Sequence, residues 1–143
     1  MRSAYHNRMI AWSLLIVALL AGLAASIFNL HTKIWWFDEA LHFFTPLSIT
    51  LVLALYAYGT LLTGRRRHEV LLVLTIAVLG LGLGTLFELV EWIYDSVFTP
   101  GNFILGKWDT MIDLSLNLAG GVIAGIVGLI MLRRGRPPKL TSL

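Results

Sequence analysis

The sequence predicts an all-α membrane protein in which four transmembrane helices form an up-down bundle. Composition, four long apolar segments and short connectors predict this class. Of the 143 residues, 57% are hydrophobic and 13% are charged, whereas an ordinary soluble domain is about 25% charged. This composition excludes a soluble enzyme, which needs a polar surface, and a disordered chain, which needs low hydrophobicity. The absence of cysteine excludes disulfides and thiolate metal sites.

Four segments are long enough to cross a bilayer, which takes about 20 apolar residues. They cover approximately residues 9–28, 41–63, 70–94 and 110–132. Because these spans use most of the chain, we expect residues 1–143 to form a single four-helix domain. The first span has a basic flank like that of a signal peptide, but its apolar core is longer than the usual stretch of about 7–15 residues. We therefore expect this span to be retained as a helix.

Basic residues predict the orientation of the spans, because Lys and Arg accumulate on the cytoplasmic side. Nine of the 11 basic residues lie at the two ends of the chain or between the second and third spans. These are Arg2, Arg8, Arg65, Arg66, Arg67, Arg133, Arg134, Arg136 and Lys139. The pattern predicts an inner (plasma) membrane protein with both termini in the cytoplasm. No basic groove-binding motif is present, so the lipid bilayer is the expected partner and nucleic acid is not.

Acidic residues show the opposite distribution. Seven of the eight lie at or near the predicted outer ends of the spans. On the third span, Glu88 and Glu91 are three residues apart and share one helix face. Gly80 and Gly84 continue that face inward. Because small residues let helix backbones approach closely in lipid, we expect the third and fourth spans to pack there.

The second and fourth spans carry matching polar positions. Asp109, Asp113 and Asn117 follow one another at intervals of four residues on the fourth span, and Asp38 and His42 are four residues apart on the second. Their similar depths predict that the three spans share one site in the outer half of the membrane. The predicted metal ligands are His42, Glu88, Glu91 and Asp113, and the predicted supporting residues are Asp38, Asp109 and Asn117.

A cluster of carboxylates inside a membrane is costly and must be neutralised. Carboxylates with one imidazole suit a hard divalent ion, so we favour Mg²⁺, Ca²⁺ or Mn²⁺, and Zn²⁺ also suits this ligand set. Acid–base chemistry is an alternative use, with Glu88 as the acid and His42 as a proton carrier. The residues leave open whether the chain is an enzyme. A polar network that only holds the helices in register is the structural alternative.

Three segments resemble the YjdF-like inner-membrane proteins: Asp38–Phe43 (DEALHF), Phe87–Trp92 (FELVEW) and Gly106–Asp113 (GKWDTMID). A looser likeness connects Asp113–Gly120 to the VanZ-like membrane proteins. The resemblance covers about two-thirds of the chain and implies a polytopic membrane protein. Two features depart from the family: the extra spans of longer YjdF-like chains are missing, and Lys107 replaces an acidic residue.

The main functional hypothesis is a membrane protein with an outward-facing carboxylate and histidine site. Such a site binds a divalent cation and acts on a lipid-linked or interfacial substrate. The alternative is a non-catalytic accessory subunit of a larger membrane complex, or a homo-oligomer, in which the polar cluster serves packing or docking.

Overall fold

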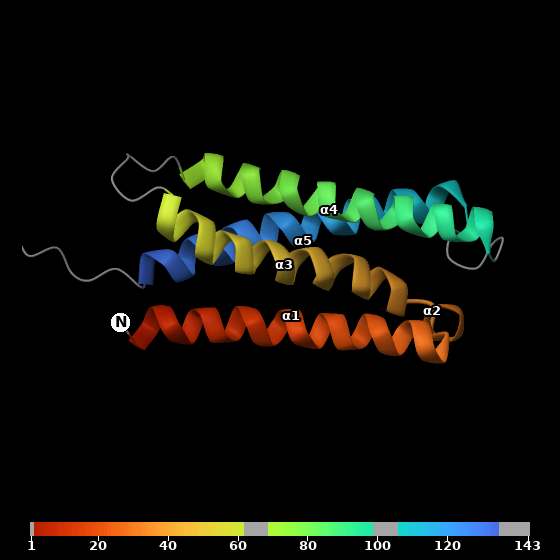
Figure 1. The fold of residues 1–143 in the computed structure, drawn as a ribbon. Coiled ribbons are helices and arrows are strands. Elements are labelled where there is room, and N and C mark those ends of the chain that lie inside the picture. Colours follow the sequence, from red (N-terminus) through yellow and green to blue (C-terminus); the bar gives the residue numbers. More distant parts are fainter. Residues whose placement is uncertain (1, 62–68, 99–105, 135–143) are drawn as a thin grey trace, which may run out of the picture.

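The computed structural model of the chain describes residues 2–61, 69–98 and 106–134. It consists of four long helices and one short helix (Figure 1). The helices are α1 (Arg2–Phe28), α2 (Leu30–Lys33), α3 (Phe37–Leu61), α4 (Glu69–Val97) and α5 (Lys107–Arg134). The four long helices are long and apolar enough to cross a membrane. The all-α prediction with four spans is therefore confirmed, although each helix extends beyond its predicted start.

Two local conformations set the helix boundaries near the predicted outer ends. Asn29 has a φ of 51° and a ψ of 48°, and this left-handed conformation ends α1 as it ends many helices. The Lys33 ammonium donates a hydrogen bond to the carbonyl of Phe28, with a distance of 2.8 Å. Gly106 has a φ of 138° just before α5, a conformation that glycine adopts far more readily than other residues.

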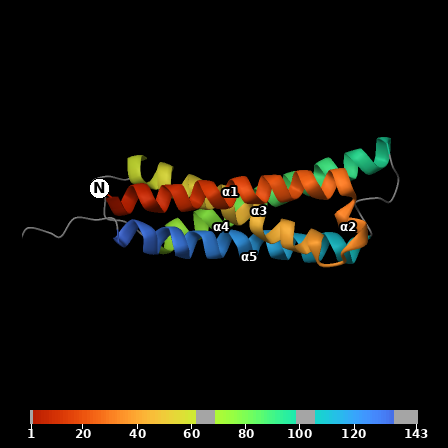
Figure 2. The same ribbon diagram turned by 90° about the horizontal axis from the view of Figure 1, so that it is seen from below.

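Helices α3 and α5 lie between α1 and α4 (Figure 1). Helix α5 packs along both α3 and α4, whereas α1 packs mainly on α3. Across the described ranges, no Cα atom of α1 lies within 8 Å of a Cα atom of α4. Helix α2 lies at the end of the bundle opposite the N-terminus (Figure 2). We call this end, where α1 and α4 end and α3 and α5 begin, the α2 end.

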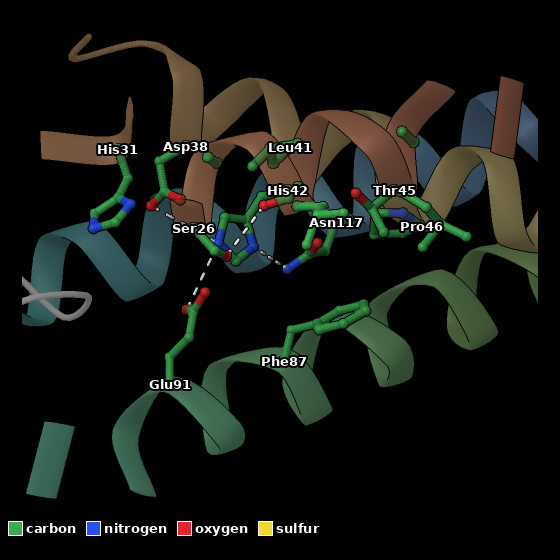
Figure 3. Close-up of a pocket in the computed structure, with 15 residues that line it drawn as sticks. Ser26, His31, Asp38, Leu41, His42, Thr45, Pro46, Phe87, Glu91 and Asn117 are labelled. Atoms are coloured by element: carbon green, nitrogen blue, oxygen red, sulfur yellow. Dashed lines mark hydrogen bonds and ion pairs between the residues drawn. The ribbon is translucent and has the colours of Figure 1, made fainter. Parts of the chain in front are cut away.

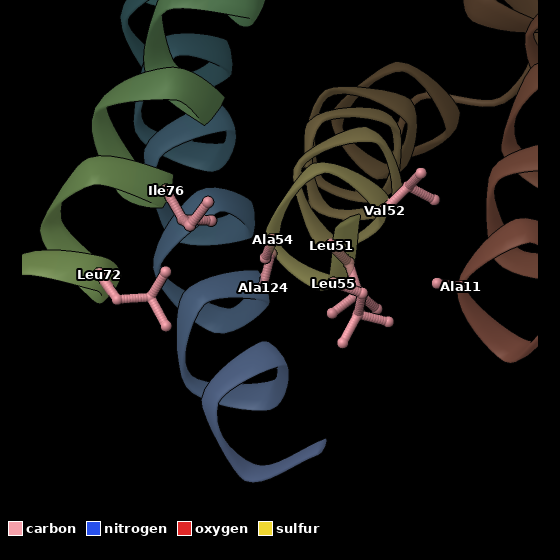
Figure 4. Close-up of a cluster of buried hydrophobic side chains, with 8 residues drawn as sticks. All are labelled: Ala11, Leu51, Val52, Ala54, Leu55, Leu72, Ile76 and Ala124. Atoms are coloured by element: carbon pink, nitrogen blue, oxygen red, sulfur yellow. The ribbon is translucent and has the colours of Figure 1, made fainter. Parts of the chain in front are cut away.

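The apolar core lies in the half of the bundle away from the α2 end, and Figure 4 shows its side chains. Its buried side chains come from all four long helices: Ala11, Leu51, Val52, Ala54, Leu55, Leu72, Ile76 and Ala124. An ion pair between Glu69 and Arg133 joins α4 to α5 at the same end. The clusters at 65–67 and 136–139, on which the predicted orientation partly depends, lie outside the described residues. The membrane side of each end therefore stays a prediction.

Glycines bring the α4 and α5 backbones into contact. A Cβ atom added at Gly80 would lie 2.7 Å from the Cα atom of Gly121, and one added at Gly125 would lie 2.9 Å from the Cα atom of Val73. On another face of α5, a Cβ atom at Gly120 would lie 2.4 Å from the carbonyl oxygen of Phe43 in α3. These close approaches place the polar positions of three helices next to one another at the α2 end.

Candidate functional site

His42 occupies the centre of the polar cluster at the α2 end. Its side chain is only 6% exposed. Its Nε2 atom lies 3.9 Å from Oδ2 of Asp38, 3.8 Å from Oε1 of Glu88 and 3.8 Å from Oε2 of Glu91. These distances exceed those of a direct hydrogen bond, which are about 2.7–3.2 Å. The imidazole is therefore surrounded by carboxylate oxygens without being locked to any one of them.

Two groups of potential metal ligands share this imidazole. One consists of Asp38, His42 and Asp113, and the other of His42, Glu88 and Glu91. Within each group, the ligand atoms lie within 4.8 Å of one another. Hard divalent ions hold oxygen ligands at about 2.0–2.6 Å, so opposite ligands of one ion are roughly 4–5 Å apart. The spacing of each group therefore matches the diameter of a divalent coordination shell.

Glu88 and Asp113 are the deeply buried carboxylates of the cluster, with residue exposures of 7% and 3%. The Thr110 hydroxyl hydrogen-bonds the Glu88 carboxylate, but Oε1 of Glu88 is buried without a hydrogen-bond partner. A buried acceptor without a partner costs about 1–3 kcal/mol, and more when it is charged. Burying Glu88 on the α4 face toward His42 is therefore unfavourable unless another interaction compensates for the unpaired oxygen.

Asn117 contacts the other side of the imidazole. It is fully buried, and its Nδ2 atom lies 3.4 Å from Nδ1 of His42, while its Oδ1 atom has no hydrogen-bond partner. A half-turn of the amide would exchange these two atoms, so that the His42 Nδ1–H donates to Oδ1. The lone pair of Nε2 would then face the carboxylates. This is the tautomer that a metal-binding histidine adopts when its other nitrogen donates to a neighbour.

Gly84 provides the space for the Asn117 side chain. A Cβ atom added at Gly84 would lie 2.0 Å from Cγ of Asn117. The sequence suggested that this glycine serves backbone packing alone. In the structure it also lets a buried amide reach His42.

Basic side chains do not neutralise the cluster. Among the described residues, no Lys or Arg forms an ion pair with Asp38, Glu88, Glu91 or Asp113. Lys33 instead bonds the carbonyl of Phe28. The paired Arg133 lies at the opposite end of the bundle. Within residues 2–61, 69–98 and 106–134, histidine is thus the only basic partner of these four carboxylates.

A cavity of about 410 Å³ adjoins the cluster (Figure 3). Asp38, His42, Glu91 and Asn117 line its polar side. In Figure 3, the Glu91 carboxylate points from α4 toward the imidazole, and Asn117 approaches the ring from α5. Glu88 and Asp113 are not among the lining residues. The cluster therefore has a buried part and a part that faces an accessible space.

The structure brings the four predicted ligands together around one imidazole, and Asn117 contacts that imidazole as a neighbour. Asp38 was expected to support the site from outside, yet it lies about as close to His42 Nε2 as Glu88 and Glu91 do. Asp109 lies one turn before Asp113, is half-buried and belongs to neither ligand group. Whether these residues bind a metal ion stays a prediction.

Sequence reasoning missed the contribution of α1 to the cavity. Ala18, Gly22 and Ala25 line the cavity from α1, and His31 lines it from α2. The signal in the sequence was the helical spacing of these small residues, which places them on one face of α1. In an apolar span, however, such a stripe also fits ordinary helix packing.

Comparison with known proteins identifies a family. Residues 3–134 match the family described as "Predicted membrane protein (DUF2238)". A protein of Thermotoga maritima, described as an uncharacterized protein, is 35% identical over 95 residues, which cover 64% of this chain and 47% of that protein. The chain thus matches about half the length of this relative. No solved structure matches the chain.

The family match supports a multi-pass membrane protein, as the composition predicted. The narrower YjdF-like resemblance and the VanZ-like likeness are not confirmed by these matches. Because the match extends over nearly all described residues, the chain belongs to the DUF2238 family of predicted membrane proteins.

Proposed function

We propose that the cluster around His42 binds a divalent cation within the membrane, and that the bound ion serves chemistry on a lipid-linked or interfacial substrate. One observation carries the proposal: a buried imidazole nitrogen faces three carboxylates, and the buried Oε1 of Glu88 has no hydrogen-bond partner. The cavity beside the cluster supports access for a substrate.

The cost of burying charge favours a cation. An acidic side chain near the middle of a membrane helix costs about 2.5–3.5 kcal/mol on insertion scales, and several neighbouring carboxylates also repel one another. No described Lys or Arg pairs with the four carboxylates. A divalent ion would offset both costs and would provide the partner that Glu88 Oε1 lacks.

The ligand types favour a hard ion. Carboxylate oxygens are the preferred ligands of Mg²⁺, Ca²⁺ and Mn²⁺, and one imidazole is compatible with Mn²⁺ and Zn²⁺. The ion would bind at His42, where the group with Asp38 and Asp113 meets the group with Glu88 and Glu91. A bound divalent ion polarises carbonyl or phosphoryl oxygens and lowers the pKa of bound water.

The direct test is ion binding by the purified protein. We expect wild type in detergent to bind about one divalent ion per chain in titrations with Mn²⁺, Mg²⁺, Ca²⁺ and Zn²⁺, followed by calorimetry and elemental analysis. Glu69→Gln is the matched control, because it removes a carboxylate that pairs with Arg133 at the opposite end. Absence of saturable binding in wild type, or equal loss in Glu69→Gln, would contradict the proposal.

Asn117 provides a second test, because it would fix the His42 tautomer. Asn117→Leu removes the acceptor for Nδ1–H and should weaken ion binding about 10–100-fold, as loss of such a neighbour does in other metal sites. Asn117→Asp keeps an acceptor and should bind the ion more tightly than Asn117→Leu. A purely structural role predicts no ion binding by either variant and a lower thermal stability for Asn117→Asp than for Asn117→Leu, since a new buried charge destabilises the fold. Calorimetry and thermal unfolding of both variants distinguish these outcomes.

A further inference from the structure

The cavity beside the cluster is amphipathic. Its polar side is formed by Asp38, His42 and Glu91, together with Asn117. Its apolar side is formed in part by five residues of α1: Ala18, Leu19, Gly22, Leu23 and Ala25. The volume of about 410 Å³ falls within the range of about 300–1,000 Å³ that is typical of small-molecule sites.

The cavity has exposed lining residues on α1 and α4. These helices have no Cα atoms within 8 Å of each other in the described ranges. Leu19 and Leu23 of α1 and Phe87 of α4 line the cavity, yet each is at least 40% exposed. All three lie within candidate membrane spans, so this exposed surface faces lipid. A molecule from the bilayer can therefore reach the cluster without crossing water.

Gly22 leaves room along the apolar side. A Cβ atom added at Gly22 would meet no other atom within 4 Å. Glycine is unfavourable in a helix interior, where it costs about 1 kcal/mol relative to alanine. Unlike Gly80 and Gly84, Gly22 does not serve close helix packing. Space for a ligand chain accounts for its position at the cavity.

Charge determines which headgroup fits the polar side. Each carboxylate has two oxygens, so Asp38 and Glu91 can each bind the ion with one oxygen and leave the other for a hydrogen bond from an ammonium group. Asp38 and Glu91 line the cavity, and their side chains are each about 25% exposed. A positively charged group entering the cavity would meet these two carboxylates. An anionic headgroup without an amine would bring a phosphate to the same oxygens without a positive group to bind them.

We propose that the cavity binds a membrane lipid with an amine-bearing headgroup, which enters between α1 and α4. The ammonium group contacts Asp38 and Glu91, and one hydrocarbon chain lies along Ala18, Gly22 and Leu23. The inference rests on the proposed function, because the headgroup would lie beside the ion at His42. This lipid class is then the substrate class of the proposed cation site.

Photolabelling in nanodiscs tests the lipid site. Two probes with identical photoreactive acyl chains are compared, one with an ethanolamine headgroup and one with a glycerol headgroup. We expect the ethanolamine probe to label residues 18–23 of α1 and Phe87 of α4 in preference to the glycerol probe. Equal labelling of these positions by both probes would overturn the headgroup assignment and with it the proposal.

Gly22→Leu and Gly82→Leu form a matched pair of variants. Both glycines would accept a Cβ atom without any contact within 4 Å, but only Gly22 lines the cavity. Gly22→Leu should reduce labelling about tenfold, which corresponds to the displacement of about two methylene groups. Gly82→Leu should be labelled like wild type, so it serves as the control for nonspecifically bound lipid. Equal labelling of the two variants would overturn the proposal.

Ion binding, measured on the same samples, separates this inference from the proposed function. Gly22→Leu should bind the divalent ion as wild type does, because Gly22 belongs to neither ligand group. Wild type that binds the ion but shows no labelling preference would refute the lipid site alone. Preferential amine-lipid labelling without ion binding would refute the cation site and support the lipid site.

Discussion

Replacing Gly84 with leucine should destabilise the bundle by several kcal/mol. The first added carbon would already lie 2.0 Å from Cγ and 2.1 Å from Nδ2 of Asn117. Asn117 is fully buried, and its amide lies against the His42 imidazole. Overpacking a core by even a few methylene groups costs about 1–3 kcal/mol. Here the helices α4 and α5 would also have to separate and lose their close packing.

Substitutions at Gly80 and Gly82 test whether the destabilisation depends on the position of the glycine. Gly80→Ala should also destabilise, by about 1–3 kcal/mol, because its Cβ atom would lie 2.7 Å from the Cα atom of Gly121, and that backbone cannot rotate away. Gly82→Leu should be neutral or stabilising, since it meets nothing within 4 Å and leucine favours helix more than glycine does. Thermal unfolding in detergent measures all three. Similar stabilities for Gly84→Leu and Gly82→Leu would show that α4 and α5 do not pack through this face.

Removing the buried carboxylates should abolish most ion binding. Glu88→Gln and Asp113→Asn each delete a charged ligand while keeping size and hydrogen-bonding groups. Loss of a residue that only contacts a ligand weakens metal binding about 10–100-fold, so loss of a ligand itself should cost at least about 100-fold. Calorimetric titration measures this change, with Glu69→Gln as the control at the far end of the bundle.

Stability measurements on the same variants distinguish a cation site from a structural network. If the cluster binds an ion, a concentration of about 100 times the Kd should stabilise wild type by about 2.7 kcal/mol. The variants should lack this gain, although without the ion they should be as stable as wild type or more so, because buried charge has been removed. A structural network predicts tolerated substitutions and no ion-dependent stabilisation in wild type. That result would contradict the proposed function.

Much of the site could be predicted from the spacing of residues along single helices. Glu88 and Glu91 share a helix face because they are three residues apart, and Asp38 and His42 do so because they are four apart. This periodicity is a property of one helix, and it sufficed to select the residues that surround His42. The close approach of Asp38 to His42 could not be predicted in this way. Its distance to Nε2, 3.9 Å, follows from the side-chain conformations of both residues, which spacing does not specify.

The role of α1 could not be predicted in the same way. In a soluble helix, the apolar stripe marks the buried face, but in a membrane both lipid-facing and protein-facing sides are apolar. Gly22 and Gly82 therefore look alike in sequence as isolated glycines within apolar spans. Only the arrangement of α1 against α3, away from α4, places Gly22 at the cavity and leaves Gly82 elsewhere.

The sequence by itself determined the four spans and the segregation of acidic residues toward one end, because both follow from the composition and length of continuous segments. Tertiary structure decided which polar groups meet. The fit of Asn117 over Gly84, the shared imidazole of His42 and the cavity lined by residues of α1 and α4 all depend on the rotation and depth of one helix relative to another. Those two variables are set by backbone contacts such as that between Gly80 and Gly121. The periodicity of a single helix carries no information about them.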